Sequence, residues 1–198
     1  MRKNMKTLGA LACAGVLGLG AIGNPVMAAD KPGEGDTNVT YVSNSTNIDA
    51  DGKVVMVIPA DVTLSKGSLT KDMKLSIKRI DGADLPTDFT AQTQIDSKNG
   101  GLLKSTTNAN IDGEYDLLNK DGQTELGVDL TNPTQFSDFY TFTNTSASVK
   151  NLDYDFKLNV QQGESDKMEQ AAAGTEFKDV LTFKVSNLTG TDLTPITP

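Results

Sequence analysis

The chain has 198 residues and is acidic, since 26 Asp and Glu against 18 Lys and Arg give a formal net charge of −8. It contains no histidine and no tryptophan, and its one cysteine is Cys13. This composition removes the general base that works at neutral pH and the nitrogen and sulfur ligands of zinc, copper and haem, and the negative charge disfavours nucleic acid and anionic lipid as partners.

The N-terminus has the three parts of a secretory signal peptide. A basic head precedes the apolar run 8–22, and Val26 and Ala28 take the −3 and −1 positions of a cleavage site. The apolar run is shorter than the roughly 20 residues that a membrane-spanning helix needs. We therefore expect residues 1–28, with Cys13, to be removed on export, so that no membrane segment remains. Three basic residues and no acidic one are then lost, and the net charge falls from −8 to about −11.

The rest of the chain predicts one domain with a short extension at each end. Residues 29–37 are predicted to be a flexible leader, residues 38–190 a β-sandwich domain and residues 191–198 a C-terminal tail. Within the domain, apolar and polar residues alternate, which is typical of antiparallel strands with one buried face. The clearest segments are 73–77, 154–160 and 177–185, together with the apolar run 54–58; weaker candidates are 39–42, 62–64, 89–95, 115–118, 125–130, 140–144 and 147–149.

Turn dipeptides separate these segments and favour tight reversals. They are Asp51-Gly52, Asp81-Gly82, Asn99-Gly100, Asp112-Gly113 and Asp121-Gly122. Together the patterns predict an all-β, immunoglobulin-like antiparallel sandwich of about 8–10 strands. One short helix or helical turn is expected near 165–173, with Ser165 as its N-cap and Gly174 as its stop.

One segment resembles the start of a calcium-binding loop. Asn47, Asp49 and Asp51 supply oxygen ligands at positions 1, 3 and 5, and Gly52 follows at position 6. Ile58 stands at position 12, where such a loop needs a bidentate glutamate. The alternative is a hairpin turn at Asp51-Gly52 that leads into a core strand, and we predict no metal or other cofactor apart from this Ca²⁺ candidate.

Carboxylates are the only plentiful catalytic groups in this composition. A glycosidase would need two of them about 5–10 Å apart with separated pKa values, and Glu114, Asp116 and Asp129 are the available candidates. Acids on the polar face of a strand are usually solvated, and the aromatic residues fall at core positions. We therefore predict that the protein is not an enzyme and that it has no catalytic residues.

Asp179 breaks the alternation of the last predicted strand. It lies in phase with Phe177, Leu181 and Phe183, which are expected to face the core. Either a bulge near Lys178 turns the carboxylate outward, or the carboxylate faces inward and accepts hydrogen bonds at the edge of the core. We favour the second interpretation.

Two segments carry a resemblance to a known group of proteins. Residues 57–64 (VIPADVTL) resemble the IP-x-x-(V/I)-T-(F/L) strand of small secreted proteins from lactic-acid bacteria and enterococci. Residues 173–186 (AGTEFKDVLTFKVS) resemble their closing strand, AGTY-x-D-x-LTF-x-(V/I)-S, which recurs in some fimbrial and coat-type subunits. Residues 37–42 are similar to cell-surface proteins encoded beside WxL-type surface components.

The resemblance covers about thirty residues and departs from the group in two ways. Phe177 replaces the tyrosine of the closing strand, and the chain contains no Trp-x-Leu motif, so the peptidoglycan-binding role of that motif is not carried over. The resemblance implies an immunoglobulin-like sandwich on the outside of a Gram-positive cell. Residues 188–198 contain no sortase-type LPxTG motif, so we expect no covalent anchoring to the wall.

These observations lead to two functional expectations. The first is a secreted, non-enzymatic structural or adhesion protein, a pilin-like subunit of a surface layer or filament that assembles through strand edges with itself or with other surface proteins. Residues 30–42 are the expected donor segment. The alternative is a monomeric binding module that recognises a host protein or carbohydrate through the loops 97–110 or 161–169 at an end of the sandwich.

Overall fold

The computed structural model describes residues 36–39, 46–49, 51–59, 62–133 and 135–193, with side chains described from Ile48 onward. The predicted signal peptide, Cys13, most of the leader and the end of the tail lie outside these residues. The elements are β1 (Asp36–Val39), β2 (Thr46–Asn47), β3 (Val54–Val57), β4 (Val62–Ser65), β5 (Thr70–Arg79), β6 (Thr90–Ser97), β7 (Leu102–Ser105), β8 (Asp112–Glu114), β9 (Asp116–Asn119), β10 (Ser137–Thr143), β11 (Asn151–Asn159), α1 (Gln162–Met168), β12 (Phe177–Lys178) and β13 (Leu181–Thr189).

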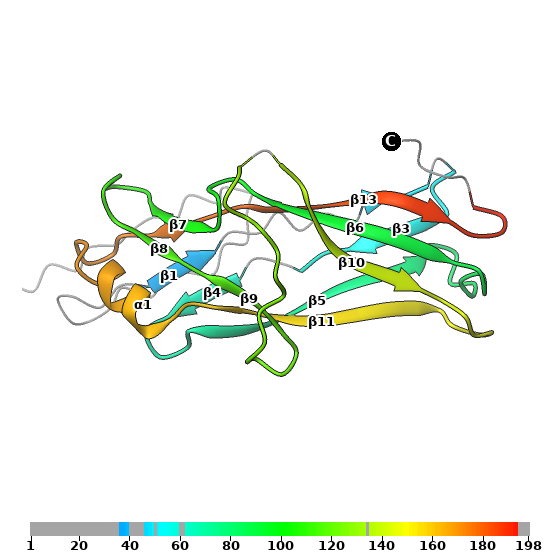
Figure 1. Ribbon diagram of the computed structural model, residues 1–198, viewed down its shortest axis with the longest axis horizontal. Helices are drawn as coiled ribbons and strands as arrows, with labels where there is room; N and C mark the ends of the chain where they lie inside the picture. Colours follow the sequence, from blue (N-terminus) through cyan, green and yellow to red (C-terminus); the bar gives the residue numbers. More distant parts are fainter. Residues whose placement is uncertain (1–35, 40–45, 50, 60–61, 134, 194–198) are drawn as a thin grey trace, which may run out of the picture.

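The strands form an all-β sandwich, as the alternating pattern predicts (Figure 1). One layer has the strand order β2-β3-β5-β11-β9, and the other has the order β10-β6-β13. At one end of the elongated molecule the second layer continues as β12-β7-β8, because β7 follows β6 and β12 precedes β13 along the chain. Strand β1 pairs with β4, and every named pair is antiparallel.

Apolar side chains from both layers form the core. Met73, Leu75 and Ile77 of β5 are buried, while Lys74 between them is exposed, which is the predicted alternation. Strand β3 is buried at three of its four positions, so the apolar run beginning at Val54 is a central strand between β2 and β5. Burial of apolar area at about 25 cal/mol per Å² is the main favourable term for such a core.

Four of the five turn dipeptides form reversals, and the fifth does not. Gly52, Gly82, Gly100 and Gly122 have φ between 67° and 73°, which glycine adopts without a steric penalty. Gly113 instead lies inside β8, so the predicted turn at Asp112-Gly113 is wrong. A Cβ at position 113 would lie 2.7 Å from Sδ of Met168, so glycine makes room here for a buried methionine.

The helix begins three residues earlier than expected, at Gln162, and ends at Met168. Ser165 is not the N-cap: Gln161 takes that position without a side-chain cap, and Ser165 is buried within the helix. The correction has a tertiary cause, because Met168 must reach the core over Gly113. Packing of a helix face outweighs the gain from a serine cap, which is typically about 1 kcal/mol.

Two weak strand candidates are also wrong. In 125–130 only Glu125 makes a bridge, to Leu118, and in 147–149 Ser148 has a φ of 64°, which belongs to a turn. Strand β1 begins at Asp36, inside the predicted leader and ahead of the 39–42 candidate. In the described part of the chain, no helix has the length and apolar character that crossing a membrane requires.

Candidate functional site

Two of the three calcium candidates, Asp49 and Asp51, lie in the turn between β2 and β3, and Asn47 is the last residue of β2. Oδ1 of Asp49 accepts the backbone N–H groups of Lys53 at 2.6 Å and Val54 at 3.1 Å, and Gly52 donates to the carbonyl of Asp49 at 3.0 Å. Asp51-Gly52 therefore forms the predicted hairpin turn. The side chain of Asn47 lies outside the described residues.

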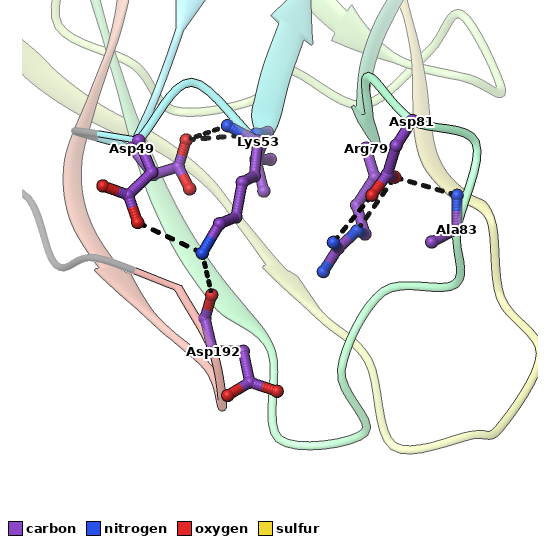
Figure 2. Close-up of polar contacts among 8 residues, drawn as sticks. Asp49, Lys53, Arg79, Asp81, Ala83 and Asp192 are labelled. Atoms are coloured by element: carbon purple, nitrogen blue, oxygen red, sulfur yellow. Dashed lines mark hydrogen bonds and ion pairs between the residues drawn. The ribbon is translucent and has the colours of Figure 1, made fainter.

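The ammonium group of Lys53 pairs with one of the calcium candidates, Asp51. Its Nζ lies 3.1 Å from Oδ2 of Asp51 and 3.0 Å from the carbonyl oxygen of Asp192 (Figure 2). Oδ2 of Asp49 is buried without a hydrogen-bond partner among the described atoms. Within the described ranges, no three acidic, histidine or cysteine side chains are grouped to hold a metal ion. Calcium binding stays a prediction from the sequence.

A bidentate ion pair lies beside this turn. Arg79, at the end of β5, donates from Nε to Oδ1 of Asp81 at 3.1 Å and from Nη2 to Oδ2 at 2.9 Å (Figure 2). These bonds, with one from the backbone of Ala83, lower the pKa of Asp81 to about 2. The same pairing, and then the charges of Asp49 and Asp192, raise the pKa of Arg79.

Asp179 is the most highly connected buried polar group of those described. It is 1% exposed and accepts from Ser97 Oγ at 2.6 Å, Tyr115 OH at 2.6 Å, Asn99 N at 3.0 Å and its neighbour Val180 N at 2.7 Å. These donors come from the last residue of β6 and the turn after it, from the junction of β8 and β9, and from the residue that precedes β13. The inward-facing interpretation of Asp179 is confirmed, and the first three of these hydrogen bonds join the carboxylate to other parts of the fold.

A cavity of about 260 Å³ opens beside this network. Glu114, Asp116 and Glu125 line it together with Gly100 and Gly101. Two of the three carboxylates named from the sequence are thus brought to one cavity, while Asp129 does not line it. Asp129 instead accepts from the hydroxyl of Thr131 at 2.6 Å and from its backbone N–H at 3.0 Å, and these bonds lower its pKa.

The two predicted binding loops gather at the same end of the molecule (Figure 1). Range 97–110 contains β7, and range 161–169 is mostly α1. They are joined through β8, since Glu164 accepts the backbone N–H of Glu114 at 2.9 Å and Lys167 contacts Asp112 at 3.1 Å. The two predicted loops are therefore largely a strand and a helix, and hydrogen bonds to β8 join them.

The side of the sandwich formed by β10 and β11 has an uncovered edge. In the described chain β10 pairs only with β6, and β11 pairs with β9 only from Phe156 onward. Between the layers, Tyr140 of β10 stacks on Tyr154 of β11 with ring centroids 3.8 Å apart and planes at 13°. Phe139 meets the edge of Tyr154 at 5.7 Å. We name these three residues, Phe139, Tyr140 and Tyr154, the aromatic seam.

Alternation alone did not identify this feature. Residues 140–144 were a weak strand candidate, and nothing local in the sequence says whether a strand is central or at an edge. The signal that was present is the run 139–143 (FYTFT), which lacks charge, proline and glycine.

No family model matches this chain, and no curated protein is significantly similar to it.

Proposed function

We propose that this protein is a secreted, non-enzymatic structural or adhesion protein of a Gram-positive cell surface, whose copies assemble through strand edges. The observation that carries the proposal is the outer edge of β10, which faces no other strand in the described chain. An uncovered edge presents a row of backbone N–H and C=O groups that pair readily with another strand.

Four further observations support it. The composition offers no histidine and no cysteine other than Cys13. The buried carboxylate of highest connectivity, Asp179, is bonded to its own fold. The first residues have the pattern of an export signal, and the closing strand resembles that of fimbrial subunits. A protein of this kind presents surfaces and strand edges rather than reactive groups.

The test is the association state of the chain without residues 1–28, which retains every described element. Multi-angle light scattering after size-exclusion chromatography is expected to show concentration-dependent oligomers. The measurement covers a hundredfold range of concentration, which corresponds to about 3 kcal/mol in association free energy. Negative-stain microscopy then separates closed oligomers from filaments or layers. A chain that stays monomeric throughout would contradict the proposal.

The expected donor segment can be tested separately. Its described part, β1, pairs with β4 of the same chain, with Asp36 opposite Ser65 and Val39 opposite Val62. A donor role would require β1 to be exchanged between copies. Deletion of residues 30–43 that leaves oligomers intact would refute exchange and leave pairing of uncovered edges as the assembly mode.

A second candidate function is a monomeric module that binds a host protein or carbohydrate. The cavity of about 260 Å³ beside Gly100 and Gly101, near the end where α1, β7 and β8 gather, is the observation that favours it. Its acidic lining suits a ligand with amine or hydroxyl donors. Loss of ligand retention in a Glu114→Gln and Asp116→Asn double variant, with an unchanged monomer, would support this candidate over assembly.

A further inference from the structure

The edge of β10 has little of the protection that edge strands usually carry. Native proteins guard such edges with lysine, proline, bulges or inward-pointing charges. The run 139–143 has no charged residue, proline or glycine, and the bulge of β10 falls on its first residue, Phe139, which has no partner in the register with β6. From Tyr140 to Thr143 the described chain thus exposes a regular, uncharged strand segment of high β-propensity.

The opposite edge of the same sheet is better protected. Strand β13 carries Lys184 near its middle, and its register with β6 shifts between Val185 and Asn187. The Lys184 ammonium reaches across β6 to Phe136, just before β10, and lies 3.9 Å from the centroid of that ring, so the bulge is the feature that protects the outer edge of β13. A bulge at the centre of a strand discourages pairing, whereas the bulge of β10 lies near its start and leaves 140–143 regular, so β10 is the more favourable edge of the two.

The directions of the strands also favour pairing of β10 with β10 of a second copy over pairing of β10 with β13. Both β10 and β13 run antiparallel to β6, so they run parallel to each other. If copies kept their second layers on the same face and joined β10 to β13, the new ladder would be parallel. Two β10 strands related by a two-fold axis would instead form an antiparallel ladder, which is somewhat more stable per residue.

The run 139–143 is complementary to itself about Thr141. In an antiparallel register centred there, Tyr140 lies opposite Phe142 of the second copy, and Thr141 lies opposite itself. Aromatic pairs across strands are favourable, and no charge is placed opposite a like charge. Tyr140, which is 36% exposed, would be covered by this pairing, and the inward-facing side chains of both copies would stay on one face.

We propose that β10 is the assembly edge and that its occupant is β10 of a second copy, paired antiparallel about Thr141 across a two-fold axis. This inference rests on the proposed function, because it names the partner and register of that assembly. The pairing joins two three-stranded sheets into one continuous sheet and extends the aromatic seam across the dimer.

The test uses two opposite charges at one exposed position. Thr141→Lys and Thr141→Glu each place like charges face to face on the two-fold axis, so each variant alone is expected to dimerise about tenfold or more weakly. Mixing the two variants pairs Lys with Glu and is expected to restore dimers. Thr141 is exposed, so circular dichroism and thermal unfolding should show that both variants remain folded. Thr182→Lys, at an exposed position of β13, is the matched control and is expected to leave dimerisation unchanged.

The outcomes distinguish failure of the β10 register from failure of assembly through strand edges in general. Restoration by the mixture, with an unaffected control, supports the two-fold register. If the Thr141 variants associate like the wild type while Thr182→Lys does not, the assembly edge is β13, and the β10 proposal falls while the proposed function stands. If each Thr141 variant is weakened and the mixture is not restored, the two-fold register is overturned. A wild-type chain that never associates would overturn both proposals.

Discussion

Asp179 shows how one residue joins segments that are far apart in the sequence. Its buried carboxylate takes hydrogen bonds from Ser97, Asn99 and Tyr115, and Ser97 Oγ in turn accepts the backbone N–H of Gly101 at 2.6 Å. A buried carboxylate is costly to desolvate unless such donors surround it. Here the donors come from the end of β6 and from segments next to β8 and β13. Their hydrogen bonds to one carboxylate therefore hold these strands together at this end of the sandwich.

Replacing this carboxylate should destabilise the fold strongly. Asp179→Asn keeps the shape but presents N–H donors to other donors, and we expect a loss on the order of 3 kcal/mol in the free energy of unfolding, measured by urea titration with circular dichroism. Tyr115→Phe removes only one of the bonds and should cost about 1 kcal/mol. Equal stability of Asp179→Asn and the wild type would show that the network contributes nothing.

The Arg79–Asp81 pair makes a prediction about protonation. Its hydrogen bonds lower the pKa of Asp81 from 3.8 to about 2. Because the folded-state pKa is depressed, the stabilisation from this pair is complete above about pH 4 and is lost as the pH falls through about 2. In Arg79→Gln, carboxyl NMR should show the Asp81 midpoint rising toward 3.8, held below it by the N–H of Ala83.

Asp88 is the control for that titration. Its pKa is also lowered, but by the backbone and hydroxyl of Thr191 rather than by an arginine. Its midpoint should be unchanged in Arg79→Gln. A shift of both carboxyls would indicate a general change in the fold instead of the loss of one ion pair.

At the scale of elements, the reversal between β6 and β7 depends on Gly100. Its φ is 72°, and a Cβ there would lie 3.1 Å from the backbone oxygen of Thr131. Both the left-handed conformation and this contact oppose any larger residue. The reversal matters because it leads β6 into β7 and brings the backbone N–H of Gly101 within hydrogen-bond distance of Ser97 Oγ. The same hydroxyl donates to Asp179.

Gly100→Ala is therefore expected to cost about 1–2 kcal/mol in the free energy of unfolding. Gly67 is the matched control, because it lies in a turn with ordinary φ and has nothing within 4 Å of where a Cβ would be. Gly67→Ala should be neutral or stabilise by up to about 1 kcal/mol through the unfolded state. Chemical denaturation of both variants measures the difference, and equal effects would contradict the strain argument.

At the scale of the whole molecule, the net charge opposes association of copies, whereas the uncharged edge of β10 favours it. The chain without residues 1–28 has a net charge of about −11, which makes copies repel one another, whereas the run 139–143 brings no charge to the proposed contact. On the outer face of the five-stranded layer, aspartates are paired with lysines, as Asp153 is with Lys74 at 3.1 Å and Asp155 with Lys120 at 2.8 Å. Such exposed pairs contribute little to stability and are expected to reduce local repulsion.

Association should therefore strengthen with salt. Raising the salt from about 0.01 M to about 0.15 M shortens the Debye length from about 30 Å to about 8 Å and screens repulsion between copies. Sedimentation equilibrium is expected to show a lower dissociation constant at the higher salt. A dissociation constant that rises instead would indicate an interface held by ion pairs, which the uncharged edge of β10 does not provide.

The sequence by itself determined the fold class, most strand positions, four turns and the inward orientation of Asp179, because period-two alternation and turn chemistry are local properties of the chain. Tertiary structure decided the rest. The position of α1 follows from Met168 over Gly113, the meeting of Glu114 and Asp116 with Glu125 follows from strand pairing, and the uncovered edge of β10 follows from which strand lies outermost. Those features depend on contacts between residues distant in sequence, and local alternation carries no information about which strands become neighbours.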